Sequence, residues 1–292
     1  MIEGIWLVLR AAGLVLSLQA AGAALFSALF GRHALAHSAC AIHRVGRRAA
    51  LAAVALLAAQ AAFEPVHLAG EASGLADATL WRLFLSSSAA AALLVRIAGL
   101  ACVALAWRLS APGSWALPLA GSLATVSSFV LTGHTSVHPA RPWLASLLFV
   151  HLAIVAFWFG SLWPLRQVTA LEPRAQAARV IAAFSALAVW VVPVIALAGA
   201  GMAVVLLPDF AALTQPYGLL LLGKIALFAL LMGLAAMNRL RLTPALERGA
   251  ARAPAQLRRS MALEYALLGA TLVLTAVMSG SFSPTERGQT GG

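Results

Sequence analysis

Long apolar runs alternate with short polar segments along almost the whole chain. A helix needs roughly 20 apolar residues to cross the core of a bilayer, and eight runs approach or exceed that length. We therefore predict an all-α fold, a polytopic membrane helix bundle that forms a single integral membrane domain over residues 1–292. The predicted spans are roughly 5–30, 47–64, 83–107, 115–132, 143–165, 180–207, 217–238 and 261–282.

The third predicted span is the least regular of the eight. Its first part, LWRLFLSSSAAAALL, can also form a short interfacial helix that precedes the true span. At the N-terminus, an acidic residue stands where a signal peptide carries basic ones, and the apolar run is longer than a signal peptide needs. We therefore expect the first helix to be retained.

Basic residues concentrate in alternate loops. Of the 20 Lys and Arg residues, 14 lie in or beside loops 31–46, 166–179 and 239–260 and the short loop at Arg108. Cytoplasmic loops of membrane proteins are enriched in Lys and Arg, so this alternation predicts that the basic loops are cytoplasmic and both termini lie outside. The net charge of +11 then reflects topology, and we expect contact with membrane lipid and no binding of nucleic acid.

Histidines gather in segments that this topology places on the outer side. The stretch LTGHTSVHP, residues 131–139, holds His134 and His138 between two apolar runs. Pro139 disfavours a helical conformation at His138, so we expect the two histidines to form two arms of a turn. His151 lies about eight residues into the next span, roughly 12 Å deep at 1.5 Å per residue. His67, just beyond the second span, can line the mouth of the same cavity.

Three cations also fall within the predicted spans, namely Arg10, Arg96 and Lys224. Ionisable groups inside a membrane are costly and usually face a bundle interior or a wet cavity. We therefore expect these three residues to line an outward-facing polar cavity. Two simpler alternatives stay open: Arg10 and Arg96 can snorkel to an interface, and His151 can bond between helices.

The histidines and cations leave more than one ligand open. Imidazole nitrogen binds copper and zinc well, and no carboxylate cluster accompanies the histidines to suggest a hard cation. The candidate metal ligands are His134, His151, His138 and His67, with Arg10, Arg96 and Lys224 as cavity-lining residues. A buried histidine also suits haem b, whose propionates the cations would then pair, which would indicate a membrane redox protein. A third possibility is an assembly or sensing partner of another membrane protein. There is no HExxH and no Walker A motif, and we expect a protein that is not an enzyme.

The stretch GHTSVHPARPWLASLLFVHLAIVAFWFGSLWPL resembles the CopD copper-resistance family. That family's core is similar to a Gly-His at the end of one helix, then a histidine, a tryptophan and small residues in the next. Here these positions are Gly133, His134, His151, Trp158 and Gly160. The distal stretches PYGLLLLGK, NRLRLTPAL and LRRSMALEYALLG also resemble the family, and the similarity extends over about residues 6–282.

One departure from the family pattern follows Trp158, where Phe159, Gly160 and Ser161 stand in place of a common Gly-Gly pair. We expect Gly160 and Ser161 still to allow another helix to approach closely. The resemblance implies a protein of the bacterial inner membrane that handles copper. It also implies movement of copper from periplasm toward cytoplasm, alongside a small periplasmic copper-binding protein.

Overall fold

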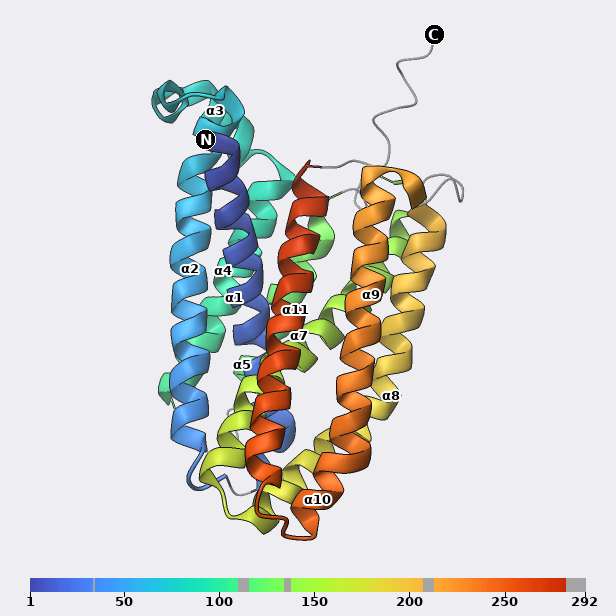
Figure 1. Ribbon diagram of the computed structural model, residues 1–292. Helices are drawn as coiled ribbons and strands as arrows, with labels where there is room; N and C mark the ends of the chain where they lie inside the picture. Colours follow the sequence, from blue (N-terminus) through green and yellow to red (C-terminus); the bar gives the residue numbers. More distant parts are fainter. Residues whose placement is uncertain (34, 110–115, 134–137, 207–212, 282–292) are drawn as a thin grey trace.

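Long helices run side by side between two ends of the molecule (Figure 1). The computed structural model describes residues 1–33, 35–109, 116–133, 138–206 and 213–281, and these residues form helices and the turns between them. The helices are α1 (Ile2–Phe30), α2 (Ala39–Ala69), α3 (Ala78–Leu85), α4 (Ser88–Leu109), α5 (Ala116–Ser127), α7 (Arg141–Leu171), α8 (Arg174–Leu206), α9 (Pro216–Met237), α10 (Thr243–Glu247) and α11 (Ala253–Ser281). Short 3-10 turns are η1 (Gly31–His33), η2 (Ala72–Ala76) and η3 (Ser128–Leu131), and a π-helical segment, η5 (Asn238–Leu242), joins α9 to α10.

The predicted all-α membrane architecture is confirmed. Within the described part of the chain, seven helices are long and apolar enough to cross a membrane. The fourth predicted span, 115–132, corresponds to a shorter apolar helix, Ala116–Leu131, made of α5 and η3. The third predicted span is divided into α3 and α4 at Ser86 and Ser87, as the interfacial alternative expects. Asp77 starts α3, because its carboxylate accepts hydrogen bonds from the amides of Thr79 (2.7 Å) and Leu80 (3.4 Å).

The two ends of the bundle differ in character. Met1, α3 and the last turns of α11 lie at one end, which we name the terminal end (Figure 1). Residues 35–38, 172–173 and 248–252 connect helices at the opposite end, which we name the basic end because its connections carry the arginine-rich segments. Both described chain ends therefore lie on one side of the bundle. Which side of the membrane that is stays a prediction.

Glycines let two pairs of helices touch backbone to backbone. A Cβ atom added at Gly22 of α1 would lie 1.7 Å from the carbonyl oxygen of Ala156 of α7, and one at Gly160 would lie 2.4 Å from Cα of Gly22. The pair Gly99 and Gly121 brings α4 against α5 in the same way, with an added Cβ at either position 2.5 to 2.6 Å from the other residue's carbonyl oxygen. The expected close approach at Gly160 is thus confirmed.

A buried carboxylate joins two helix connections at the basic end. Glu172, directly after α7, accepts hydrogen bonds from the amide of Ser38 (2.8 Å), the hydroxyl of Ser38 (2.6 Å) and the amide of His37 (3.0 Å). Nδ1 of His37 lies 3.2 Å from the same carboxylate. Since Ser38 is the N-cap of α2, the negative charge also faces the positive end of that helix. One side chain thereby joins the α1–α2 connection to the end of α7.

Candidate functional site

His138 lies in the turn that leads into α7, as the position of Pro139 predicts. Its Nδ1 accepts a hydrogen bond from the amide of Ala140 at 3.0 Å, and its carbonyl accepts one from the amide of Arg141 at 2.9 Å. In a neutral imidazole the proton then resides on Nε2, so a metal ion would have to displace the Ala140 contact. His134, the other arm of the predicted turn, lies outside the described residues.

His67 belongs to a polar cluster at the terminal end that joins α1 to α2. Its ring stacks on the indole of Trp6, with centroids 4.3 Å apart and an interplanar angle of 12°. Nδ1 of His67 approaches the carboxylate of Glu3 at 3.3 Å without the alignment of a hydrogen bond. The same Trp6 donates its indole N–H to Glu64 at 3.0 Å. His67 is therefore held on one ring face by Trp6 and approached on one edge by an acid.

Arg10 reaches the same cluster from within α1. Its guanidinium carbon lies 4.9 Å from the centre of a Trp6 ring, and Nη2 donates to the hydroxyl of Ser279 of α11 at 3.2 Å. The side chain thus links α1 to the last turns of α11. This places Arg10 between helices, near the polar cluster that contains His67.

Arg96 is buried and points into the bundle. It is 8% exposed, donates from Nε to the hydroxyl of Ser128 at 2.9 Å and lies 3.6 Å from the centre of the Phe129 ring. Both partners belong to η3, so a cation of α4 fixes the end of the short helix α5. A snorkelling side chain would be exposed, and Arg96 is not.

His151 lies in α7 where that helix meets α8. Its Nδ1 is 3.2 Å from the carbonyl oxygen of Ile195, and Gly199 of α8 lies against the ring edge, since an added Cβ there would be 3.5 Å from Cε1. Lys224 lies on α9 and is half-buried. That His151 and Lys224 line one cavity stays a prediction.

The described site residues do not form one cluster. His67 and Arg10 share the terminal-end cluster, His138 lies in the turn before α7, Arg96 fixes η3, His151 lies at the contact of α7 with α8, and Lys224 lies on α9. Within the described ranges, no group of three or more His, Cys, Asp or Glu side chains is arranged to hold a metal ion. Because His134 lies outside those ranges, a shared site of His134 and His151 stays a prediction.

Sequence reasoning missed a buried carboxyl group. Glu264 of α11 is 3% exposed and accepts hydrogen bonds from the amide group of Asn238 in η5 and from the indole of Trp158 in α7. A signal was available, because Glu264 is an acid within the apolar stretch MALEYALLG, and an ionisable group inside a span usually has a function. Glu264 and its two partners come from three separate elements, α11, η5 and α7, and no sequence spacing connects them.

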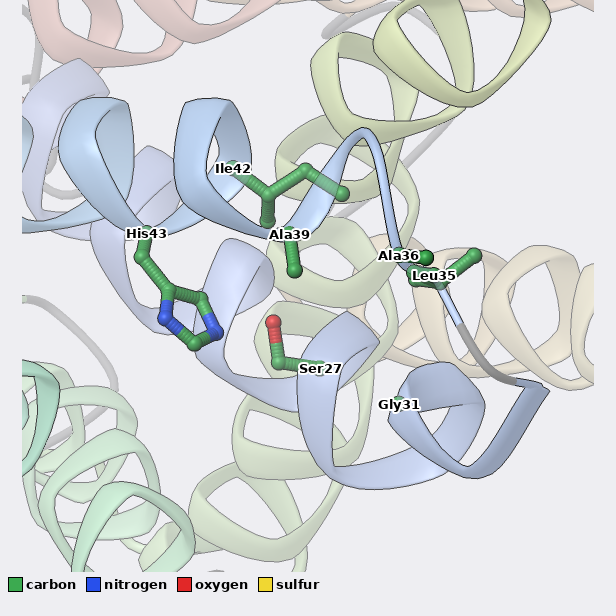
Figure 2. A pocket seen from close by; sticks show the side chains of 7 residues that line it. All are labelled: Ser27, Gly31, Leu35, Ala36, Ala39, Ile42 and His43. Carbon is green, nitrogen blue, oxygen red and sulfur yellow. The ribbon is translucent and has the colours of Figure 1, made fainter. Parts of the chain in front are cut away.

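Two pockets lie at the basic end, away from the predicted histidine site. One has a volume of about 340 Å³ between α1 and α2, where the Ser27 hydroxyl and the His43 ring flank the same space (Figure 2). The other, about 670 Å³, is lined by Cys40, His43, Arg44, Arg47, Arg48, Leu51 and Trp107. Its three arginines suit an anion, such as a lipid phosphate, more than a metal cation.

Comparison with known proteins identifies the family. Residues 178–278 match the family model described as "Copper resistance protein D". The chain is 33% identical over 212 residues to the copper resistance protein D of Pseudomonas syringae pv. tomato, and the match covers 65% of this chain and 67% of that protein. No solved structure matches the chain. The extent of this match, together with the helical membrane architecture, shows that the chain belongs to the copper resistance protein D family.

Proposed function

We propose that this protein moves copper across the bacterial inner membrane, from the periplasm toward the cytoplasm, and that His151 binds the ion within the bundle. The observation that carries the proposal is the contact between Nδ1 of His151 and the carbonyl oxygen of Ile195 at 3.2 Å. A carbonyl can only accept, so the contact places the imidazole proton on Nδ1 and leaves the lone pair of Nε2 free for a metal. Histidine ligands of metals are commonly oriented by such a second hydrogen bond.

The outer histidines would deliver the ion to His151. His134 and His138 precede α7, and His67 lies in the terminal-end cluster, so copper released by a small periplasmic copper-binding protein would meet them first. Imidazole suits copper, and a copper ion bound at Nδ1 of His138 would have to displace the hydrogen bond from the Ala140 amide. The relative from Pseudomonas syringae is named for copper resistance, which supports copper as the cargo.

The haem alternative has less support from the described contacts. Arg10 and Arg96 would be expected to pair with haem propionates, but their guanidinium groups are engaged with Trp6 and Ser279, and with Ser128 and Phe129. A visible spectrum of the purified protein separates the two ligands directly. If the wild type shows a Soret band and His151→Ala does not, then His151 binds haem and not copper.

The proposed function is tested by measuring copper accumulation in cells that lack this protein until it is expressed from a plasmid. Wild-type protein should raise cytoplasmic copper, measured by elemental analysis after the periplasmic fraction is removed. His151→Ala should lower copper affinity by at least about tenfold, which is the lower range for disturbing a metal ligand's environment, and uptake should fall accordingly.

A matched control is His33→Ala, which removes a basic-end histidine that contacts the carbonyl oxygen of Phe30. This variant should accumulate copper like the wild type. Gel filtration in detergent confirms that each variant is folded. Wild-type copper accumulation by a folded His151→Ala variant would refute the role of His151.

A further inference from the structure

The buried carboxyl group of Glu264 lies where three helices meet. It is on α11, eleven positions after Ala253, and its hydrogen-bond donors are Nδ2 of Asn238 and the indole N–H of Trp158. Those donors belong to η5 and α7, which both pack against α11. A carboxyl group with 3% exposure in a membrane-spanning helix is costly to ionise unless other groups compensate its charge.

Positive charge does not supply that compensation among the described residues. The ion pairs of the described chain are His37 with Glu172 and His67 with Glu3, and neither includes Glu264. Arg239 donates to Ser185 of α8, Arg10 to Ser279 at the far end of α11, and Lys224 acts on His151. The remaining ionisable groups on α11 and on the elements packed against it are Glu3, Arg141, Arg166, Arg241, Glu247, Arg258, Arg259 and Tyr265, and Tyr265 stacks on Phe159.

The surroundings of Glu264 hold partners for both forms of the carboxyl group. An ionised carboxylate needs donors, and Asn238 and Trp158 provide two. A protonated carboxyl group also needs an acceptor for its O–H, and Oδ1 of Asn238 is buried without a partner. Oγ of Ser260, one helical turn earlier on the same face of α11, is also buried and unpartnered.

Further unpartnered oxygens line the neighbouring helices. Oγ of Ser161 on α7 lies one turn beyond Trp158, and Oε1 of Gln19 on α1 belongs to the side chain whose Nε2 donates to the carbonyl of Gly160 at 3.4 Å. Buried polar atoms are nearly always hydrogen bonded, so these oxygens would accept hydrogen bonds from any water molecule between α1, α7 and α11. Water there would give the carboxyl group a route for a proton.

The π-helical segment adds a backbone feature to the same place. Asn238 begins η5, and its carbonyl accepts the hydroxyl of Thr243, five residues on, at 2.9 Å. Pro244 follows and has no amide hydrogen with which to continue an α-helical pattern. Segments of π-helix are rare and often occur at functional sites, and this one aims the Asn238 amide at Glu264.

We propose that Glu264 is a proton-binding site inside the bundle and that it gives up and regains its proton as copper moves through the protein. Release converts the carboxyl group and a water molecule into a carboxylate and a hydronium ion, which leaves along the polar atoms of Ser260, Ser161 and Gln19. The carboxylate stays bonded to Asn238 and Trp158, and reprotonation restores the O–H. The link to copper rests on the proposed function, whereas the proton-binding site does not.

Infrared difference spectroscopy of the full-length protein in lipid tests the protonation without copper. Between acid and alkaline buffer, the wild type should lose a protonated-carboxyl band, and that band should shift in deuterated buffer because the proton exchanges. Glu264→Gln keeps the shape and the hydrogen bonding of the side chain but cannot ionise, so it should lack the band. Glu247→Gln, which changes an exposed carboxylate on α10, should retain it. Identical difference spectra for the wild type and Glu264→Gln would overturn the proposal, as would a Glu264 band that neither pH nor deuterium changes.

Copper uptake into liposomes that contain a pH-sensitive dye tests the link. Wild-type protein should move protons as copper enters, and Glu264→Gln should reduce that proton movement at least tenfold while Glu247→Gln leaves it unchanged. Copper uptake with undiminished proton movement in Glu264→Gln would refute the link. A wild type that takes up no copper would instead refute the proposed function and the link together, and the infrared result would still decide whether Glu264 binds a proton.

Discussion

Glu172 is the residue whose ionisation stabilises the basic end. Burial by itself would raise the pKa of this carboxyl group, but the hydrogen bonds from the hydroxyl and amide of Ser38 and from His37 together lower it. The folded protein therefore favours the carboxylate more than the unfolded chain does. This stabilisation is fully present above the unfolded pKa and disappears as the pH falls through the lower folded pKa.

We predict that the protein loses thermal stability in detergent as the pH falls below about 4.5, the ordinary pKa of a glutamate. Glu172→Gln should lower the free energy of unfolding at pH 7 by about 2 kcal/mol, because the buried hydrogen bonds lose their charge. Its stability should then depend less on pH below about 4.5. Glu247→Gln serves as the exposed control, and equal acid sensitivity of the wild type and Glu172→Gln would contradict this role.

If copper binds His151 as proposed, the positive charge of Lys224 would oppose it. A repulsion of about 1 kcal/mol between two like charges is modest at an effective dielectric constant of about 20, and it corresponds to about a fivefold change in affinity. Lys224→Met should therefore raise the affinity for Cu(I) at least about fivefold, measured by competition with a chromogenic chelator. Arg252→Met, which removes an exposed cation at the basic end, should leave the affinity unchanged. Equal or weaker copper binding by Lys224→Met would show that the charge of Lys224 does not act on the bound ion.

At the scale of helices, the contact between α1 and α7 leaves the least space for a larger side chain. Gly22→Ala should destabilise the protein by at least about 3 kcal/mol, because the added methyl group meets the backbone of Ala156 and both helices must separate. Gly233→Ala is the matched control, since nothing lies within 4 Å of a Cβ added at that position of α9. Thermal unfolding in detergent measures both variants, and a Gly22→Ala protein as stable as Gly233→Ala would contradict the crossing.

The sequence predicts helices well and their packing partners poorly. Hydropathy marks the spans because an apolar run in water would be unfavourable whatever its neighbours are, and the serines at 86 and 87 mark the division between α3 and α4. The position of Arg96 depends instead on Ser128 and Phe129, whose approach comes from tertiary packing. The sequence does not predict the contacts of Glu264 for the same reason, because Trp158 and Asn238 lie 106 and 26 positions away in the chain.

At the scale of the whole molecule, the predicted orientation is open to chemical labelling. Cys40 is exposed at the basic end, and Cys102 lies in α4. With Cys102 changed to serine, a membrane-impermeant maleimide should label Cys40 in inside-out vesicles and leave it unlabelled in spheroplasts. Ser73→Cys, at the exposed η2 segment of the terminal end and with both natural cysteines removed, should give the opposite pattern. Labelling of Cys40 in spheroplasts would reverse the predicted topology.

Burial within the chain differs widely among the helices. In the most apolar window of α1, 61% of residues are buried inside the protein, whereas the corresponding share for Gly218–Glu247, which contains α9 and η5, is 6%. Most of this window is therefore not covered by the described part of the chain. Among the seven candidate spans of the described chain, this one, which includes Asn238, has the smallest buried share.

The glycine contact between α1 and α7 has a mechanical consequence. Where two backbones touch, neither helix can slide or roll past the other without a clash. Gly22 and Gly160 therefore fix the position of α1 relative to α7 at this point. By contrast, the segment of α9 that leads into the π-helical turn at Asn238 has little of its surface buried within the described chain.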